Sequence, residues 1–231
     1  MKAVILAGGY GKRLRPLTEK IPKNLIPILN KPLIEWQISW LKNQGIREFV
    51  LLIGYLGDKL QEHLGDGSKY GVSIEYSREV VPLGTGGALF NAYDLLKDED
   101  NFIMINGDII TNLNIKPLTS IEPEYVGALA LVPLPSPYGI IRVNSENRIE
   151  AFIEKPLIKD YWINAGVYFL RNDIFKYLPE KGDIERTAFP KLANEKKLKA
   201  VKYFDVKWKS IDTHKDLEEA TKMLEELEGK L

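Results

Sequence analysis

The sequence predicts an α/β fold built on a doubly wound, mostly parallel sheet. Three short apolar runs lack polar alternation, at residues 3–6, 49–53 and 102–105. Such runs are typical of strands that are buried on both faces of a parallel sheet. Between them lie segments with apolar residues at helical spacing, at 33–41 and 58–64. Strands that alternate with helices in this way indicate repeated βαβ units.

Length and composition describe one ordinary globular domain. The chain has 231 residues, of which 45% are apolar and 28% charged, with 32 basic and 32 acidic side chains. This balance gives no indication of a nucleic-acid or membrane partner. There is no cysteine, which excludes disulfides and thiolate catalysis. No leader segment or apolar run of membrane-spanning length is recognisable, so we expect a cytoplasmic protein.

The remaining elements follow from local signals. Pro32 suits the first turn of the helix at 33–41, and Gly45 ends it. A third strand is expected at 72–76 and a helix at 88–96. The second half predicts strands at 126–134, 148–156, 168–170 and 199–204, an extended segment at 138–141, and helices at 172–178, 185–193 and 214–227.

The first strand breaks directly into a glycine-rich loop with basic residues. Gly8, Gly9 and Gly11 leave backbone N–H groups open to a ligand, and cations follow at Lys12, Arg13, Arg15 and Lys23. A polyphosphate fits such a loop. The spacing is neither the dinucleotide-binding fingerprint nor a P-loop. The other interpretation is a tight turn whose basic residues face solvent.

The longer motif resembles a known family. Gly8-Gly9-x-Gly11-x-Arg13-Leu14-x-Pro16-Leu17-Thr18, followed by Pro22-Lys23, is similar to the signature of the sugar-1-phosphate nucleotidyltransferases. The resemblance implies a Rossmann-like nucleotide-diphospho-sugar transferase fold, similar to glycosyltransferase A, with an inserted sugar-binding subregion. It implies that Leu6, Ala7, Gly8, Gly9 and Gly11 bind the nucleotide and that Arg13 and Lys23 are catalytic. One departure is Asn24, where the family usually has proline.

A second glycine-rich stretch runs from Glu79 to Leu89 and opens into the helix at 88–96. Alone it would be read as a closely packed helix start. Beside the first motif it resembles the family's base-binding loop, with Pro82, Gly84, Thr85 and Gly86 as nucleotide-binding residues. Its Pro-Leu-Gly-Thr-Gly-Gly form is more similar to guanylyl- and uridylyl-transferring members than to thymidylyl-transferring ones.

The strand at 102–105 ends in Asn106-Gly107-Asp108. A carboxylate at the end of a strand, next to a glycine that leaves room, suits Mg²⁺ whose other ligands are substrate phosphates. The other interpretation is that Asp108 only caps the following turn. The resemblance favours Asp108 as a metal ligand and Asn106 and Gly107 as neighbours of the sugar phosphate.

Three further motifs resemble the family's sugar-binding portion. They are Tyr138-Gly139, Glu154-Lys155-Pro156 and Asn164-Ala165-Gly166. A sugar 1-phosphate needs hydrogen-bonding groups for its hydroxyls, which Glu154 and Asn164 offer, and a cation such as Lys155 for its phosphate.

The segment Trp208-Lys209-Ser210-Ile211-Asp212-Thr213 aligns with the family's Trp-x-Asp-Ile/Thr-Gly-Thr. The family's second metal aspartate therefore falls on Ser210, a poor Mg²⁺ ligand. Asp212 projects to the same side of an extended segment and could replace it. Otherwise the metal relies on Asp108, phosphates and water.

The sequence therefore predicts a single nucleotidyltransferase domain that uses Mg²⁺. Residues 1–115 form a nucleotide-binding half, 116–213 a sugar-phosphate-binding half, and 214–231 a docking helix. The leading hypothesis is the reaction of GTP with mannose 1-phosphate. Alternatives are glucose 1-phosphate with UTP or dTTP, heptose 1-phosphate with GTP, and a non-catalytic regulatory paralogue, for which Ser210 and Asn24 speak. A sugar-phosphate kinase would need a P-loop. Assembly into a homo-oligomer is left open.

Overall fold

The computed structural model describes residues 1–228 and confirms the doubly wound α/β fold. Within these residues one seven-stranded sheet forms the centre, in the order β12-β8-β11-β6-β1-β4-β5. Its strands are β1 (Lys2–Ala7), β4 (Glu48–Ile53), β5 (Ser73–Arg78), β6 (Asn101–Asn106), β8 (Gly127–Pro135), β11 (Leu157–Arg171) and β12 (Leu198–Lys202). β11 runs antiparallel to both of its neighbours, and the other pairs are parallel. The sheet is therefore mostly parallel, as predicted.

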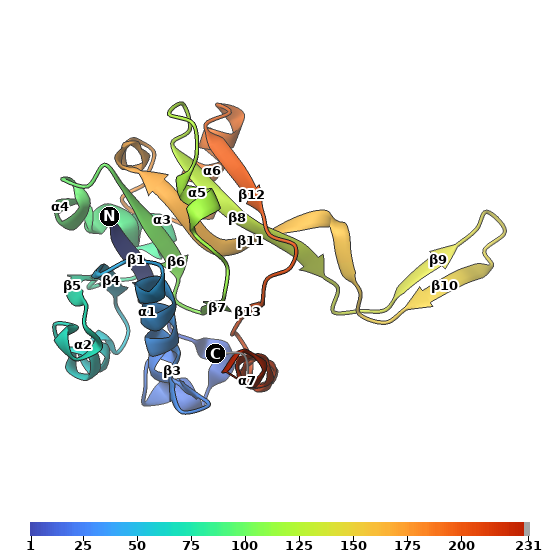
Figure 1. Cartoon of the computed structure of the whole chain (residues 1–231), viewed down its shortest axis with the longest axis horizontal. Coiled ribbons are helices and arrows are strands. Elements are labelled where there is room, and N and C mark those ends of the chain that lie inside the picture. Colours follow the sequence, from blue (N-terminus) through green and yellow to red (C-terminus); the bar gives the residue numbers. More distant parts are fainter. Residues whose placement is uncertain (229–231) are drawn as a thin grey trace.

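Three two-stranded ribbons and several helices complete the chain (Figure 1). The ribbons pair β2 (Pro27–Ile28) with β3 (Lys31–Pro32), β7 (Ile109–Thr111) with β13 (Trp208–Ser210), and β9 (Ile140–Val143) with β10 (Ile149–Ile153). The α-helices are α1 (Leu33–Asn43), α2 (Gly57–Leu64), α3 (Gly84–Asn91), α4 (Tyr93–Leu96), α5 (Lys116–Thr119), α6 (Ala188–Asn194) and α7 (His214–Glu228). Short 3₁₀ helices lie at Lys12–Leu14, Leu17–Glu19, Lys23–Leu25, Ser68–Tyr70, Asn172–Lys176 and Ile184–Arg186.

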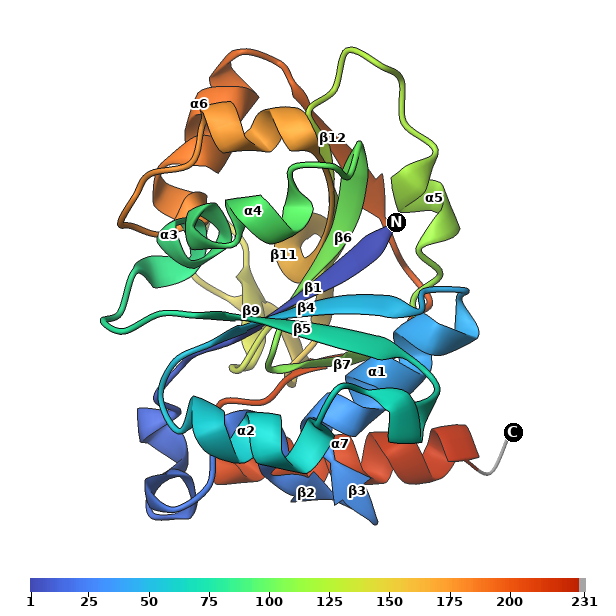
Figure 2. The same cartoon turned by 90° about the vertical axis from the view of Figure 1, so that its left-hand side faces the viewer.

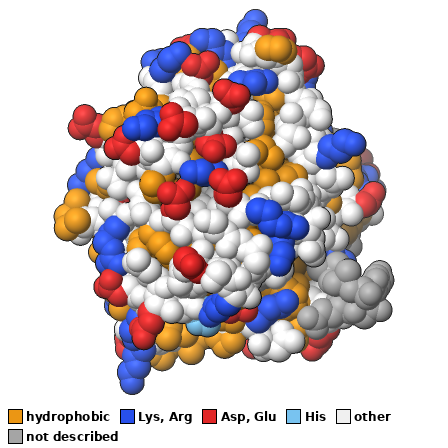
Figure 3. All heavy atoms as spheres, turned by 60° about the vertical axis from the view of Figure 1, so that its left-hand side comes forward, with side chains coloured by type: hydrophobic (Ala, Val, Ile, Leu, Met, Phe, Trp, Pro, Cys, Tyr) orange, Lys and Arg blue, Asp and Glu red, His pale blue; other side chains and the backbone are white. Residues whose placement is uncertain are grey.

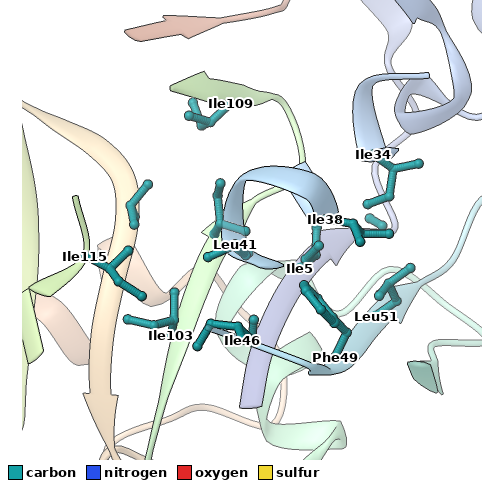
Figure 4. Close-up of a cluster of buried hydrophobic side chains, with 14 of the residues drawn as sticks. Ile5, Ile34, Ile38, Leu41, Ile46, Phe49, Leu51, Ile103, Ile109 and Ile115 are labelled. Carbon is teal, nitrogen blue, oxygen red and sulfur yellow. The ribbon is translucent and has the colours of Figure 1, made fainter. Parts of the chain in front are cut away.

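Helices cover both faces of the sheet, which explains why its strands lack polar alternation. Figure 2 shows α1, α2 and α7 on one side and α3, α4 and α6 on the other. Ile5 packs with Ile38 and Leu41 of α1 on the first side (Figure 4), and Val4 faces the second cluster. Successive residues of one strand therefore enter two separate cores.

The C-terminal helix α7 docks on a third cluster, beside the loop that follows β1. Ala220 and Leu224 of α7 are buried with Leu14 and Ile211. This contact holds the chain after β13 against the first loop. Residues 229–231 of the predicted docking segment lie outside the described residues.

Several predicted boundaries were wrong. The helix predicted at 88–96 begins earlier, at Gly84, and is divided at Ala92. Residues 168–170 complete a strand, as predicted, but this strand, β11, already starts at Leu157 and is interrupted by register shifts against β8. The short helix predicted at 172–178 is present as a 3₁₀ helix and ends two residues earlier, at Lys176. β7, β13 and α5 were not predicted from sequence.

Candidate active site

The first glycine-rich loop opens into a pocket of about 410 Å³ at the carboxyl ends of β1 and β6. Ligands of doubly wound sheets bind at this edge. Thirteen of the predicted site residues line the pocket: Leu6, Gly8, Gly9, Gly11, Arg13, Lys23, Pro82, Gly84, Thr85, Asn106, Gly107, Asp108 and Asp212. The structure thus brings together residues from both ends of the chain.

The glycines of the first loop are required by close packing. Gly11 has φ +57°, and a Cβ there would lie 2.8 Å from the side chain of Thr18. The Thr18 hydroxyl donates a hydrogen bond of 2.9 Å to the Gly11 carbonyl and fixes the turn. A Cβ on Gly8 would lie 2.7 Å from a carboxylate oxygen of Glu79. Ala7 is buried beneath the loop and does not line the pocket.

Four charged side chains form a network in the pocket. Lys23 Nζ lies 2.9 Å from Asp108 Oδ2 and 3.0 Å from Asp212 Oδ1. Arg13 Nη2 lies 2.9 Å from the same oxygen of Asp212. The Lys23 side chain is 12% exposed, whereas that of Arg13 is 71% exposed and faces the opening. An anionic ligand would therefore meet Arg13 from solvent and Lys23 at the floor.

Asp108 is placed by the turn that follows β6. The Gly107 N–H donates a bond of 3.0 Å to the Leu6 carbonyl, and a Cβ at Gly107 would lie only 2.1 Å from that oxygen. The buried amide of Asn24 donates a bond of 2.7 Å to the Gly107 carbonyl. Asn24 thus ties the segment that carries Lys23 to the turn that carries Asp108.

Asp212 is placed by β13 and the start of α7. The Ile211 N–H donates to the Asp108 carbonyl at 2.9 Å, which sets the two aspartate segments side by side. The Asp216 carboxylate accepts bonds from the N–H groups of Asp212 and Thr213 at 3.1 and 2.8 Å. Burial opposes ionisation of Asp216, but hydrogen bonds from Lys209 and Thr213 outweigh it and lower its pKa to about 2.

The position of Ser210 explains why Asp212 enters the network. Ser210 ends β13 opposite Ile109, and its hydroxyl donates a bond of 3.4 Å to Asp212 Oδ2. The carboxylate that the sequence lacks at position 210 is therefore present from position 212, beside Asp108.

This donor set fits Mg²⁺. Asp108 and Asp212 hold one ammonium group between them, so their oxygens can also converge on one metal cation. Proteins usually hold Mg²⁺ through one or two carboxylates together with substrate phosphates. Residues 1–228 contain no group of three or more His, Cys, Asp or Glu side chains arranged around a cation. A metal here would need phosphate or water as further ligands.

The second glycine-rich segment contributes Pro82, Gly84 and Thr85 to the pocket lining. In this segment the Leu83 N–H donates a hydrogen bond of 2.9 Å to the Glu79 carboxylate, and the Thr85 hydroxyl donates one of 2.6 Å to the Glu185 carboxylate. Gly86 does not line the pocket. It packs against the backbone at Gly182, because its N–H donates a hydrogen bond of 2.9 Å to the Gly182 carbonyl. Its lack of a side chain serves close backbone packing.

Of the residues predicted to bind the sugar phosphate, Asn106 and Gly107 line the pocket and the other five do not. Tyr138, Gly139, Glu154 and Lys155 lie around the base of the β9–β10 hairpin, and none of them lines the pocket. Gly139 and Glu154 are neighbours, since a Cβ on Gly139 would lie 3.0 Å from Glu154 Oε2. The structure therefore brings this group together, but away from the nucleotide pocket.

Asn164 lies on β11 and is linked to β6 through a buried tyrosine. The side-chain NH₂ group of Asn164 donates a hydrogen bond of 2.8 Å to the Tyr168 hydroxyl. Its side-chain oxygen accepts a hydrogen bond of 2.9 Å from the Gly166 N–H. Burial raises the pKa of Tyr168, so this hydroxyl stays protonated. Asn164 does not line the pocket, although Asn106 does.

Seven pocket residues were not predicted as site residues. They are Tyr10, Lys12, Asn24, Leu52, Glu79, Ala88 and Asp183. Tyr10, Lys12 and Asn24 lie within or directly after the first motif, so their place in the sequence could have indicated that they line the pocket. Asp183 gave none, because it comes from a loop distant in sequence. On the face of the molecule drawn in Figure 3, the acidic and basic side chains of the described residues are interspersed, without a wide surface of one sign.

Comparison with known proteins finds similar sequences over nearly the whole chain. Residues 2–226 match the family model described as "Nucleotidyl transferase". A mannose-1-phosphate guanyltransferase of Saccharomyces cerevisiae is 38% identical over 230 residues, which are 94% of this chain and 62% of that protein. The mannose-1-phosphate guanylyltransferase catalytic subunit beta of Dictyostelium discoideum is 38% identical over 206 residues, 86% of this chain and 57% of its own.

The chain thus spans about three fifths of the length of these relatives. Among solved structures, HddC from Yersinia pseudotuberculosis matches with a TM-score of 0.76 and 27% identity, covering 96% of this chain and 99% of that one. The same protein complexed with GMP-PN matches with a TM-score of 0.74 and 25% identity, at the same coverage. In residues 1–228, every helix is too short or too polar to cross a membrane.

Proposed function

The chain belongs to the nucleotidyl transferase family, and from this premise we propose that it is a sugar-1-phosphate nucleotidyltransferase that converts GTP and mannose 1-phosphate to GDP-mannose and pyrophosphate. Two relatives that are 38% identical to it are named for mannose 1-phosphate and guanylyl transfer. HddC, which shares the fold, has been solved with GMP-PN.

The reaction explains the chemistry of the pocket. An oxygen of the sugar phosphate attacks the α-phosphorus of the triphosphate in line, and the bond to the β-phosphate oxygen breaks, so that pyrophosphate leaves. The attacking phosphate is already ionised near neutral pH and needs no general base. The main obstacle is repulsion between anions. Fixed cations and positioning are therefore the expected means of catalysis, and the pocket carries Lys23 at its floor and Arg13 nearer to solvent.

Each part of the pocket has a role in this proposal. The backbone of Gly8 to Gly11 binds the triphosphate, and Arg13 neutralises the charge that develops on the reacting phosphates. Lys23 holds Asp108 and Asp212 in place at 2.9 and 3.0 Å. These two aspartates would hold Mg²⁺, which, when bound, shields phosphate charge.

The two halves of the chain divide the substrates in this proposal. Residues 1–115 contribute most of the pocket and bind the nucleotide. Residues 116–213 bind the sugar phosphate, with Asn164 on β11 and Glu154 and Lys155 after β10 as the groups available to it.

The observation that carries the proposal is the convergence of Arg13, Lys23, Asp108 and Asp212 beside the glycine loop. The test is pyrophosphate release with Mg²⁺ for GTP, UTP, dTTP, ATP and CTP against the 1-phosphates of mannose, glucose, N-acetylglucosamine and heptose. We expect the highest kcat/KM for GTP with mannose 1-phosphate. Pyrophosphate release with a different pair would change the assigned substrates but leave the assigned reaction in place. If no pair released pyrophosphate and the protein still bound GDP-mannose, the enzyme hypothesis would be wrong and a regulatory paralogue would be the better assignment.

A further inference from the structure

The turn between β6 and β7 carries Asp108 into the pocket. β6 ends at Asn106 and β7 begins at Ile109, so Gly107 and Asp108 form the turn. A glycine adopts many backbone conformations and places little restriction on the residue that follows it. The direction of the Asp108 carboxylate therefore has to be set by the contacts that hold both ends of the turn.

Gln37 of α1 holds both ends at once. Its side-chain NH₂ group donates a hydrogen bond of 3.0 Å to the Asn106 carbonyl and one of 2.9 Å to the Ile109 carbonyl. The two N–H bonds belong to one planar amide group, so together they fix the distance between the two carbonyls. Because only Gly107 and Asp108 lie between these carbonyls, the same pair of bonds restricts the conformation of the turn.

The surroundings of Gln37 show that its side chain acts as a donor. It is 2% exposed and lies on the face of α1 that also buries Leu33, Ile34, Ile38 and Leu41, three of which Figure 4 labels. The reverse orientation of the amide would turn its oxygen against both carbonyls. In the orientation observed, this oxygen has no hydrogen-bond partner among the described residues. A buried acceptor without a partner is unfavourable, so the two donated bonds are what the side chain contributes here.

The other two carbonyls of the turn also meet donors inside the protein. The Gly107 carbonyl accepts the bond from the buried Asn24 amide, and the Asp108 carbonyl accepts from the N–H of the buried Ile211. Four consecutive carbonyl groups are thus bonded to three different parts of the chain. This leaves the Asp108 carboxylate, whose side chain is 27% exposed, as the charged group that the turn presents to a ligand.

We propose that Gln37 is a positioning residue that sets the direction of the Asp108 carboxylate and, through it, the affinity of the pocket for a divalent cation. Gln37 does not line the pocket and acts only through the turn. Asp108 Oδ2 lies 2.9 Å from Lys23 Nζ, and this place depends on where the turn is held. Groups behind a metal ligand commonly tune metal affinity by orienting it. The effect on Mg²⁺ rests on the proposed function, whereas the placement of Asp108 does not.

Gln37→Met is the main test variant, because methionine keeps the length and helix propensity of glutamine and removes both donors. Gln37→Leu is a second variant that fills the core differently. The matched control is Gln44→Met at the end of the same helix. Gln44 is also a half-satisfied glutamine, but its oxygen accepts a bond of 2.7 Å from the Ile115 N–H, beyond the turn. Circular dichroism and urea unfolding should show that all three variants are folded.

Two readouts need no enzymatic activity. In a crystal structure of nucleotide-free Gln37→Met, Asp108 should leave its ion pair and lie beyond about 4 Å from Lys23 Nζ. The second readout is the affinity for Mn²⁺, which takes the same oxygen ligands as Mg²⁺ and is measured by electron paramagnetic resonance. Its dissociation constant should rise about 10–100-fold in both Gln37 variants and stay unchanged in Gln44→Met.

A double-mutant cycle shows whether Gln37 acts through Asp108. In an Asp108→Asn background, Gln37→Met should change the Mn²⁺ dissociation constant less than about twofold, because the carboxylate that it positions is already absent. An effect as large as in the wild-type background would overturn the proposal, since Gln37 would then act on the pocket as a whole.

Kinetics separate positioning from a general loosening of the pocket. In the active enzyme, the Mg²⁺ concentration for half-maximal activity should rise as the Mn²⁺ dissociation constant does, while KM for GTP changes less than about twofold. Equal rises in both would overturn the proposal, and so would unchanged Mn²⁺ affinity in both Gln37 variants. If wild-type protein released no pyrophosphate with any substrate pair, the proposed function would be wrong, but the crystal structure and the Mn²⁺ affinity would still decide the role of Gln37.

Discussion

Replacement of Asn24 by alanine tests how the first loop is tied to the turn after β6. The Asn24 side chain is 3% exposed, and its amide donates the bond of 2.7 Å to the Gly107 carbonyl. Alanine removes the donor and leaves a buried carbonyl without this partner. Loss of one partner from a buried hydrogen bond costs about 1–3 kcal/mol. In a chain of this size each kcal/mol lowers Tm by roughly 2–4 °C, so the expected fall is roughly 2–12 °C.

Calorimetry and urea unfolding measure this effect directly. The urea midpoint should fall while the m-value stays constant, because the surface exposed on unfolding hardly changes. Asn43→Ala is the control, since Asn43 is exposed at the end of α1, and its effect should stay within about 0.5 kcal/mol. Activity should fall too, because the link holds Lys23 near Asp108. Two variants of equal stability would refute the structural role assigned to Asn24.

Three further predictions concern the charged groups. Arg13→Ala should lower kcat by about 100-fold or more and change KM little, as steady-state kinetics would show; an effect on KM alone would contradict its role at the transition state. The pKa of Asp216 is about 2 in the folded protein and about 3.9 in the unfolded chain. Ionised Asp216 therefore stabilises the folded state fully above pH 3.9, and this stabilisation is lost as the pH falls through 2. Asp216→Asn should therefore be less stable than wild type by on the order of 2 kcal/mol at pH 7, a gap that urea unfolding should find narrower at pH 3. Asp212→Gly should abolish Mg²⁺-dependent activity, and adding Ser210→Asp should restore part of it; if the single variant remained fully active, Asp212 would not be a metal ligand.

The strands of the nucleotide half were predictable because their signals are local. Residues 3–6 and 102–105 are continuous apolar runs, and a strand buried on both faces needs nothing else to be recognised. β11 was not predictable in the same way. Its first half pairs with β8 through interrupted registers, and its side chains from Leu157 to Tyr161 are mostly exposed. Only long-range pairing makes this segment a strand, and periodicity does not report pairing.

The residues of the candidate site also differ in how far the sequence alone could place them. Gly8, Arg13 and Lys23 lie within one short motif, so their proximity was readable from the sequence. The place of Lys155 was not, because it depends on the direction in which the β9–β10 hairpin leaves the sheet. A motif states which side chains a site contains; where they stand depends on contacts between segments that are distant in sequence.

Asp212 shows how geometry can preserve a charge that a sequence comparison finds missing. Two features bring its carboxylate beside Asp108: the Ile211 N–H bonds to the Asp108 carbonyl, and the capped start of α7 holds the Asp212 backbone. Because Lys23 sits between both carboxylates, neither faces the other unshielded before an anionic substrate arrives. A residue two positions further along the chain thus supplies the second carboxylate beside Lys23 that position 210 does not carry.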